Sequence, residues 1–444
     1  MKKYIVLSGS ILLLLLTSII IPPLQFFSMA ALDTAQECSN FSVKHGDQVF
    51  FGSNDDMPPD RLSVSEAAIR IYPPTTTGQG YAEFGYFTPE GKNWAWNGWL
   101  NESGLAIGTM SIPARSVKPH PEKPIKGVVK FLISTMRNAS SVEEVIELAL
   151  QTDFSFGLRD TWWFQIQFAD ATGDSVVISP GLDGGPVITR KPVSQAYLVS
   201  TNFNPALPEG TKAGLIDSYE RYDTAVTLLE YDLNVPDFSE VNARRVLEAV
   251  HIEWFGSFAA SSRVFDLQNG EIYLYHYSQF DDGVKLNLAD ELKKGYQQIR
   301  VRDLFPKEVV EQGESRHKSV AMRDLTTLVF FLAAVVSFLG SLIGFLVVVV
   351  RNRGNDNANA APVKLRLFMA IGIFWSVSCW SLLQMLNNIY PPNLINPIFP
   401  MQAMLVLGPL GGLGAIVAVW AFATLRKDES VLPRDDQVSL EGVS

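Results

Sequence analysis

Long apolar runs at both ends of the chain confine any globular domain to its middle. Three such runs occupy about 325–350, 367–388 and 400–424, and each is long enough to cross the ~30 Å hydrocarbon core of a bilayer as a helix. A further run, Ile5 to Ile21, lies near the start. The residues between these regions have an ordinary globular composition and are numerous enough to bury one substantial core.

The N-terminus has the pattern of a secretory signal peptide, predicted here over residues 1–30. Two lysines precede the apolar run, a Pro-Pro pair ends it, and Ser28-Met29-Ala30 offers small residues for cleavage. Because the run is on the long side, an uncleaved anchor is the alternative. Either way the following segment is exported, with residues 31–37 as a short propeptide and 38–305 as an ectodomain.

Basic residues indicate how the C-terminal spans cross the membrane. The loop 351–366 is rich in Lys and Arg and the third span ends at Arg426-Lys427, whereas the loop 387–397 is uncharged. By the positive-inside rule, 351–366 and the tail 428–444 face the cytoplasm and the ectodomain lies outside. The spans contain no internal charged residue, so we predict that they anchor the domain, through the connector 306–324, and transport no solute.

Charge and cysteine content narrow the classes of function. The formal net charge of −10 leaves no basic stripe for phosphates and argues against a nucleic-acid partner. Of the two cysteines, Cys379 lies in an apolar run and is interpreted as a small buried hydrophobe. Cys38 then has no disulfide partner in the exported domain, and an unpaired thiol outside the cytoplasm needs a chemical explanation. We expect neither a metal nor a cofactor.

Strand and helix patterns occur in separate clusters along the ectodomain, which predicts a layered α+β domain. A hairpin is expected around His45-Gly46-Asp47, and Asn269-Gly270 gives the strongest short hairpin pattern in the chain. The predicted helices are 141–150, opened by the capping box Ser141-Val142-Glu143-Glu144, 218–230 and 239–250, and the predicted strands are 41–44, 49–51, 163–168, 176–178, 264–267 and 272–275.

The chemistry available to Cys38 follows from the residue itself. A thiol attacks an amide as the thiolate and needs a nearby base. Cleavage between Glu37 and Cys38 would create an α-amine on the nucleophile's own residue, with a reference pKa of about 7.7–8.0, close to what a general base needs near neutrality. None of the five histidines lies in a motif with Cys38, although a papain-like partnership with His251 stays open.

Several motifs follow one another in the order found in a known enzyme family. They are Cys38-Ser39-Asn40-Phe41, Phe51-Gly52-Ser53-Asn54-Asp55-Asp56, Asn101-Glu102-Ser103-Gly104-Leu105, the turn 170–175, Thr201-Asn202 and Ser218-Tyr219-Glu220-Arg221-Tyr222. Over roughly 38–280 the chain therefore resembles cysteine N-terminal-nucleophile hydrolases of the choloylglycine hydrolase, penicillin V acylase and linear amide C–N hydrolase type. The resemblance implies a four-layer αββα domain, here followed by an all-α three-helix transmembrane region, 325–427.

The resemblance also implies roles for individual polar residues. Asp56 would accept a hydrogen bond from the α-amine of Cys38 and orient it, while Asn202 would donate its side-chain amide to the developing oxyanion. Asn101 would supply a further polar contact or a backbone donor. Arg221 would keep the surroundings of the nucleophile electropositive.

Together these features predict an exported, membrane-tethered amidase that hydrolyses linear N-acyl amide bonds through a thioester on Cys38. An N-acyl lipid or another amphiphile is the expected substrate, because the anchor holds the site near the bilayer. The bile-salt enzymes have Arg after Phe-Gly where this chain has Ser53, which weakens any transfer of their specificity. Acyl transfer to an amine is the alternative reaction. A catalytically silent membrane receptor on the same fold is the alternative from another class.

The site residues also have simpler interpretations. Cys38 could be an incidental buried thiol, Asp55 and Asp56 could cap a turn, and Arg221 could lie on a solvated helix face. Glycosylation is a further alternative, since acceptor sequons begin at Asn40, Asn101 and Asn138. For Asn101 the site role is favoured.

Overall fold

The structure is a computed structural model and describes most of the predicted ectodomain. The described residues are 37–57, 66–87, 94–155, 161–207, 216–254, 257–319 and 322. The chain divides into two compact units, Met1–Met322 and Arg323–Ser444. The predicted signal peptide, the three spans and the cytoplasmic tail all lie outside the described residues. Among the described residues, no helix is both long enough and apolar enough to cross a bilayer.

The first large sheet contains the strand that begins at the predicted nucleophile. Its order is β12-β1-β2-β14-β15-β16, with β13 paired to β14, and every pairing in it is antiparallel. The strands are β1 (Glu37–His45), β2 (Gln48–Met57), β12 (Tyr197–Ser200), β13 (Glu253–Trp254), β14 (Ser257–Asp266), β15 (Glu271–His276) and β16 (Val284–Asn287). The central strand β2 is therefore flanked by β1 on one side and by β14 on the other.

The second large sheet, also antiparallel, has the order β11-β10-β9-β6-β5-β4-β3-β17. Its strands are β3 (Glu66–Tyr72), β4 (Tyr81–Phe87), β5 (Trp94–Asn101), β6 (Ala106–Ser116), β9 (Thr161–Ala169), β10 (Ser175–Pro180), β11 (Pro186–Arg190) and β17 (Gln297–Arg300), and a small parallel pair is formed by β7 (Ile125–Lys126) and β8 (Thr152–Asp153).

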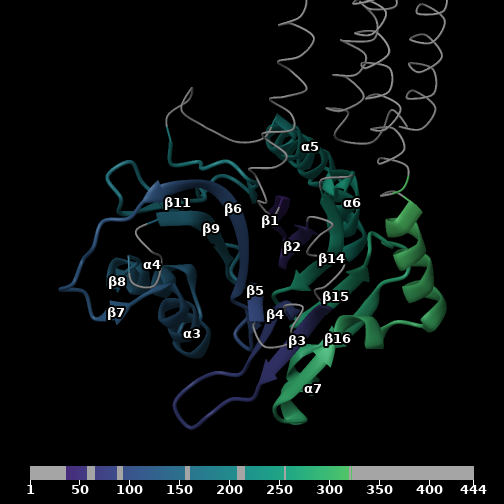
Figure 1. Cartoon of the computed structure of the whole chain (residues 1–444), viewed down its shortest axis with the longest axis horizontal. Coiled ribbons are helices and arrows are strands. Elements are labelled where there is room, and N and C mark those ends of the chain that lie inside the picture. Colours follow the sequence, from purple (N-terminus) through teal and green to yellow (C-terminus); the bar gives the residue numbers. More distant parts are fainter. Residues whose placement is uncertain are drawn as a thin grey trace, which may run out of the picture. The chain divides into compact units, whose positions relative to one another are not determined.

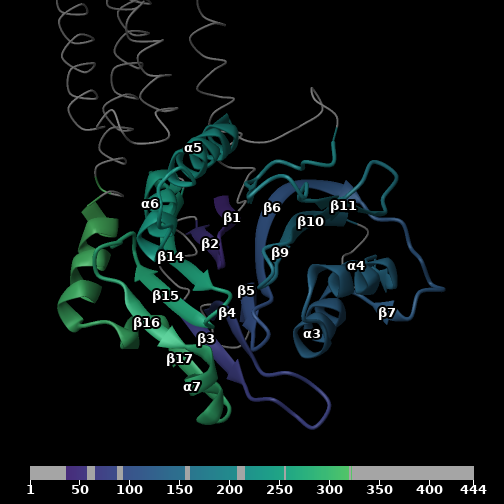
Figure 2. The same ribbon diagram turned by 180° about the vertical axis from the view of Figure 1, so that it is seen from behind.

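Helices cover the outer faces of the two sheets, as Figures 1 and 2 show. α3 (Val128–Asn138) and α4 (Val142–Leu150) pack on the second sheet, and α5 (Ile216–Asp232) and α6 (Glu240–Val250) pack on the first. α7 (Leu288–Lys293) and the 3-10 turn η1 (Val301–Leu304) lie near β3, and residues 307–319 are helical.

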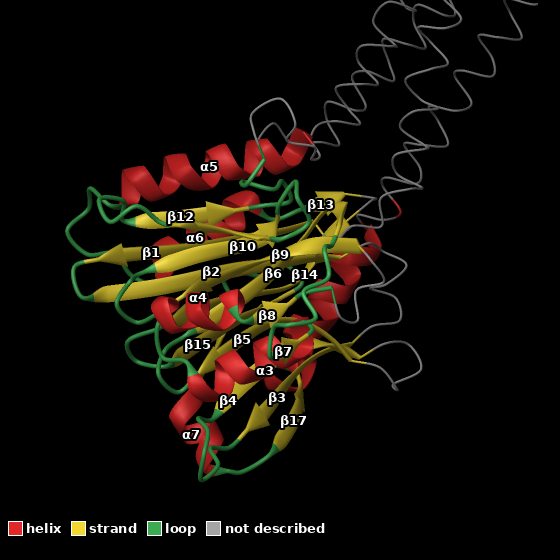
Figure 3. Ribbon diagram, turned by 90° about the vertical axis from the view of Figure 1, so that its left-hand side faces the viewer, coloured by secondary structure: helices red, strands yellow, loops and turns green. Residues whose placement is uncertain are grey.

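The sheets pack face to face, and their strands stack in layers in Figure 3. One apolar core lies between the sheets and includes Phe51, Leu100 and Phe265, all fully buried. Another lies between the second sheet and its helices and includes Phe131 and Trp162. Burial of these two cores gives the described part of the chain the predicted αββα layering.

The predicted elements are present; most strands and α5 are longer than predicted, whereas α4 and α6 each begin one residue later. The hairpin around His45-Gly46-Asp47 joins β1 to β2, and Asn269-Gly270 joins β14 to β15, where Gly270 adopts a φ of 63°. The three helices predicted from the sequence correspond to α4, α5 and α6. At α4 the Ser141 hydroxyl accepts from Glu144 N at 3.3 Å, but the Glu144 carboxylate accepts from Ser140 N at 2.6 Å. The capping box is thus displaced by one residue on its return contact.

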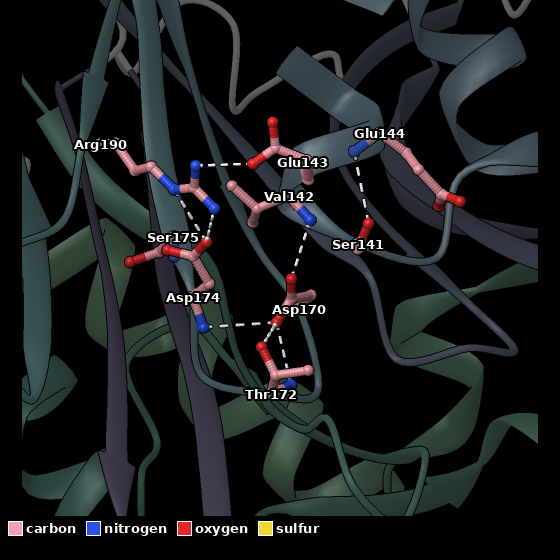
Figure 4. Close-up of polar contacts among 9 residues, drawn as sticks. All are labelled: Ser141, Val142, Glu143, Glu144, Asp170, Thr172, Asp174, Ser175 and Arg190. Atoms are coloured by element: carbon pink, nitrogen blue, oxygen red, sulfur yellow. Dashed lines mark hydrogen bonds and ion pairs between the residues drawn. The ribbon is translucent and has the colours of Figure 1, made fainter. Parts of the chain in front are cut away.

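The turn 170–175 ties the β9–β10 hairpin to the start of α4 (Figure 4). Asp170 is buried, and its carboxylate accepts from Thr172 N at 2.9 Å, from Thr172 Oγ1 at 2.6 Å and from Val142 N at 2.8 Å. Arg190 donates to Asp174 at 2.9 Å and to Glu143 at 2.7 Å. This motif, which contributed to the family resemblance, therefore fixes a helix N-terminus on a sheet edge.

We expect Asp170→Ala to lower the free energy of unfolding by about 2–4 kcal/mol, because it leaves the buried N–H group of Val142 without its acceptor and removes the turn hydrogen bonds from Thr172. Urea denaturation followed by tryptophan fluorescence measures the change. Asp183→Ala is the matched control, since exposed Asp183 accepts a turn hydrogen bond from Gly185 N at 3.1 Å and should change stability by no more than about 0.5 kcal/mol. Equal effects of the two substitutions would contradict the role given to Asp170.

Candidate active site

Cys38 is the second residue of β1 and lies directly opposite Asp55 of β2. Side chains of directly opposed residues in an antiparallel pair point to the same face of the sheet. The next two opposed pairs are Asn40 with Ser53 and Ser42 with Phe51, so these side chains share that face with the thiol. Cys38 is only 2% exposed, so the unpaired thiol lies inside the layered domain.

The face with Cys38 is turned toward the second sheet. The Tyr86 hydroxyl of β4 donates to Asp55 Oδ2 at 3.3 Å. Arg263 of β14 donates to Asp55 through Nη1 and, through Nη2, to Ser53 Oγ at 3.0 Å and to the Asn97 carbonyl of β5 at 3.2 Å. Both members of the Arg263–Asp55 ion pair are buried. A polar layer therefore extends between the sheets beside the thiol.

The opposite face of β1 and β2 is turned toward the helices α5 and α6. Arg221 of α5 is fully buried and donates through Nη1 to the Cys38 carbonyl at 2.8 Å and to Ser39 Oγ at 2.7 Å. Asp56 accepts from Ile252 N, which follows α6, at 3.4 Å. The solvated helix face considered for Arg221 is therefore excluded, and its guanidinium holds the backbone of Cys38.

Asn202 is held by the same guanidinium. Its Oδ1 accepts from Arg221 Nη2 at 2.8 Å, and its Nδ2 donates to the Ser111 carbonyl of β6 at 2.9 Å. These two contacts define which end of the amide group is the donor. Asn202 follows β12, the strand paired with β1, so its place beside Cys38 is set by sheet register.

The surroundings of Cys38 disfavour the thiolate in the uncleaved chain. Burial is the largest cause and raises the thiol pKa well above its usual value, and the charges of Asp55 and Asp56 raise it further. A hydrogen bond from the Asp56 backbone N–H and the charge of Arg221 lower it, but they do not outweigh burial. The expected effect of Arg221 is present, whereas the net environment is not electropositive enough to ionise the thiol near neutrality.

Asp55 is held between opposing influences. Burial is the largest cause and raises the pKa of Asp55 on balance, although Arg263, the amide of Asn97 and the hydroxyl of Tyr86 each lower it. Burial also raises the pKa of Tyr86 well above its usual value, so this phenol stays protonated and donates to the carboxylate. The Asn97 side chain lies near Asp55 without forming a hydrogen bond of normal geometry, since neither its Nδ2 nor its Oδ1 has a hydrogen-bond partner among the described residues.

Of the residues predicted to form the site, the structure brings Cys38, Asp56, Asn202 and Arg221 together. Asn101, at the end of β5, is not brought to this group. The Asn101 amide donates to Ala139 O at 2.8 Å and to Met136 O at 3.3 Å, and its Oδ1 accepts from Leu105 N at 2.9 Å. These contacts join the β5–β6 turn to the C-terminus of α3. The Asn101 and Asn40 side chains are buried and therefore inaccessible to glycosylation. Asn138, the third sequon, is exposed.

His251 has other partners than the thiol. It caps the C-terminus of α6, its Nδ1 lies against the Glu248 carbonyl, and its Nε2 lies 3.5 Å from the Glu253 carboxylate. The papain-like alternative has no support from these contacts. Among the described residues, no group of three or more His, Cys, Asp or Glu side chains is arranged to hold a metal ion.

The site also contains residues that the sequence did not indicate. Asp55 had only a turn-capping interpretation, and Arg263, Asn97 and Tyr86 had none. Asp55 could have been found from the alternation of β1 and β2, because the predicted hairpin places it opposite Cys38. Arg263 required the pairing of β14 with β2 across 210 residues of sequence, seen in its contact with Ser53, and no local pattern specifies such a pairing.

Comparison with known proteins gives matches at the level of structure. No family model and no curated protein matches the chain. Two solved variants of conjugated bile acid hydrolase from Clostridium perfringens are similar to it, each at 16% identity, covering 61% and 59% of this chain and 98% and 96% of their own, with TM-scores of 0.47 and 0.46. The class of enzyme that the sequence resembles is thus also the class of these structures.

Asn101→Ala should act on stability and leave the thiol unchanged. Loss of its buried hydrogen bonds should lower the free energy of unfolding by about 2–3 kcal/mol, while the rate at which iodoacetamide alkylates Cys38 in the folded protein should stay within twofold. Asn138→Ala is the control, because exposed Asn138 makes a local contact with Ser134 O at 2.9 Å and should change neither quantity. A selective loss of Cys38 reactivity in Asn101→Ala would return this residue to the site.

Proposed function

We propose that the described domain is an amidase whose nucleophile is Cys38, released as the N-terminal residue by cleavage after Glu37. The supporting observation is the arrangement at the start of β1. Arg221 grips the Cys38 carbonyl at 2.8 Å, Asp56 contributes both a carboxylate and a backbone N–H beside the residue, and Asn202 is oriented by the same guanidinium. The polar groups thus converge on the first residue that the mature chain would have.

Cleavage would supply the base that the uncleaved chain lacks. In the uncleaved chain the nitrogen of Cys38 is a peptide nitrogen and cannot accept a proton, and the thiol is buried with a raised pKa. The new α-amine, with a reference pKa of about 7.7–8.0, would take the thiol proton directly. Asp56 is the strand partner of Glu37, the residue whose removal exposes the amine, so we assign its carboxylate the role of orienting that amine.

The reaction then follows from these groups. The thiolate adds to the carbonyl carbon of the substrate amide, and the Asn202 amide stabilises the oxyanion that develops. Collapse breaks the C–N bond, the α-ammonium gives its proton to the departing amine, and the acyl group stays on Cys38 as a thioester. Water, deprotonated by the α-amine, adds to the thioester and releases the carboxylic acid and the thiol.

The proposal includes a location and a class of substrate. The apolar runs at 325–350, 367–388 and 400–424 support attachment to a membrane, with the amidase domain on the extracytoplasmic side. An enzyme held at a bilayer meets amphiphiles at high local concentration, so N-acyl lipids are the substrates to test first. Protease treatment of intact cells should digest the 38–305 region and spare the tail 428–444. Digestion of the tail alone would reverse the proposed orientation.

We take the cleavage to be autocatalytic, with the Cys38 side chain attacking the Glu37 carbonyl, so Cys38→Ser should abolish hydrolysis of N-acyl amides and leave residue 37 attached to residue 38. The serine hydroxyl, with no thiolate character, is a far weaker nucleophile at this position. A panel of N-acyl amides differing in acyl length, assayed by mass spectrometry, measures the first effect, and N-terminal sequencing measures the second. Cys379→Ser is the control and should retain both activity and processing.

The outcomes separate the alternatives. A wild-type chain that is never cleaved after Glu37 and captures no acyl electrophile would support a silent receptor on this fold. An acyl-Cys38 intermediate that yields a new amide with added amine faster than it yields acid would support an acyltransferase. Full activity in Cys38→Ser would refute the proposed nucleophile.

Processing should move the pH dependence of Cys38 alkylation downward. In the uncleaved chain the raised thiol pKa keeps the thiol protonated below pH 9, so the rate should rise only at more alkaline pH. In the cleaved chain the neighbouring amine should bring the midpoint down by at least about one pH unit. Mass spectrometry distinguishes the two N-terminal peptides in one sample, so both forms are measured together. Identical profiles would contradict a role for the α-amine.

A further inference from the structure

Arg263 is a buried cation in the layer between the two sheets. It is 1% exposed, although it belongs to a residue type that is rarely buried without a partner. Its guanidinium contacts Asp55, Ser53 and the Asn97 carbonyl, and its Cζ lies 5.4 Å from the centre of the Phe84 ring. A buried charge of this kind needs a structural or chemical reason.

Sheet register places Arg263 of β14 and Cys38 of β1 on either side of the strand β2. Arg263 is the partner of Ser53 in the β14–β2 pairing, and Cys38 is the partner of Asp55 in the β1–β2 pairing. Ser53 and Asp55 are two residues apart on β2, so both point to the same face. Asp55 therefore stands between the thiol on one neighbouring strand and the guanidinium on the other.

The second sheet is shaped to admit the guanidinium. A Cβ atom at Gly98 of β5 would lie 2.5 Å from Arg263 Nη2 and 2.9 Å from its Cζ, so a larger residue there would displace the guanidinium. Asp55 Oδ1 and Arg263 Nε have no hydrogen-bond partner among the described residues. The pair is thus held through Asp55 Oδ2 and Arg263 Nη1, while Nη2 donates to Ser53 and Asn97. Neither group is saturated by hydrogen bonds among the described residues.

We propose that Arg263 is a positioning residue for Cys38, which neutralises the Asp55 carboxylate opposite the thiol and so permits the thiolate to form. This inference depends on Cys38 being the proposed nucleophile. Ser53, at which the chain departs from the family pattern, is the β2 residue paired with Arg263. The positive charge on this face is therefore supplied from β14.

The balance of charge around the Cys38 thiol explains why Arg263 is needed for the thiolate to form. Among the described residues, the largest charge effects on Cys38 and Asp55 involve Tyr86 from β4 and Arg263 from β14 on the side of the second sheet, Asp56 from β2 and Arg221 from α5 on the helix side, and the charge of Asp55 itself on the thiol. Tyr86 stays neutral, so two carboxylates are opposed by two guanidinium groups. Removing Arg263 leaves Asp55 uncompensated, and a like charge at this separation opposes ionisation of the thiol.

Arg263→Gln should raise the pH midpoint of Cys38 alkylation by about one to two pH units, measured with iodoacetamide on the full chain and peptide mass spectrometry. Each unit corresponds to a tenfold loss of thiolate at neutral pH. Arg137→Gln is the matched control, because Arg137 is a part-buried guanidinium that donates to Pro73 O and Gln79 O at 2.9 and 2.8 Å, and it contacts neither Cys38 nor Asp55. Its midpoint should not move.

Two double variants test whether Arg263 acts through Asp55. Asp55→Asn with Arg263→Gln removes both charges and should return the midpoint to within about half a unit of the wild type. Ser53→Arg with Arg263→Ser exchanges the two residues that are paired between β2 and β14, so the guanidinium stays on the same face. This variant should also restore the midpoint of Cys38 alkylation. Both variants avoid an unpaired buried charge, so they remain informative if Arg263→Gln alone fails to fold.

A midpoint unchanged in Arg263→Gln, or raised by one unit or more in the variant that lacks both charges, would overturn this inference. Failure of the proposed function has a different signature, namely no amide hydrolysis by the wild-type chain. A wild-type chain that lacks amidase activity, in a series whose variants change their alkylation midpoints as expected, is a separate outcome. That result would refute the proposed amidase function and would support the role of Arg263 in the charge balance at Cys38.

Discussion

The organisation of this domain depends on burying a run of polar residues on a strand that is covered on both faces. After Gln48 every residue of β2 is buried, and the four residues before the terminal Met57 are the polar Ser53-Asn54-Asp55-Asp56. Burying a carboxylate without a partner is costly, so two in succession are tolerated only where other elements bring cations and donors to them. The fold supplies these from both sides of the sheet.

Alternation along β2 divides the partners between the two faces. Asp55 faces the second sheet, where Arg263 and Tyr86 contact it, while Asn54 and Asp56 face the helices and contact Leu247 O and Ile252 N. Arg221, from α5, binds the neighbouring strand at the Cys38 carbonyl. The surroundings of the thiol therefore exist only when β4, β14, α5 and the end of α6 have all been assembled around β1 and β2.

Local patterns predicted much of this architecture, and non-local pairing accounts for what they missed. The hairpins at His45-Gly46-Asp47 and Asn269-Gly270 and the helices α4, α5 and α6 carry their own turn or periodicity patterns. Of the predicted site, Asn202 and Arg221 are found beside Cys38. The site role expected for Asn101 came from its motif, which gives no information on which end of β5 lies near β1.

The position of Arg263 could not be predicted from local sequence, since its sequence context is that of an ordinary strand residue. Its position is determined by the pairing of β14 with β2, and long-range pairing is specified by the packing of whole sheets, not by a short motif. Asp55 is intermediate, because its place opposite Cys38 follows from the predicted hairpin register once both residues are assigned to strands. The electrostatic environment of a nucleophile is thus the part of a site that sequence patterns specify least.

The same buried environment offers a reason for linking activity to processing. A thiol close to two carboxylates and removed from solvent is held protonated, so under the proposed processing the uncleaved chain would be protected from alkylation and oxidation. A base attached to the nucleophile's own residue needs no movement of the surrounding layers to reach it. Arg221 and Arg263 can then be fixed before cleavage, and the change that activates the thiol is confined to one peptide bond at the start of β1.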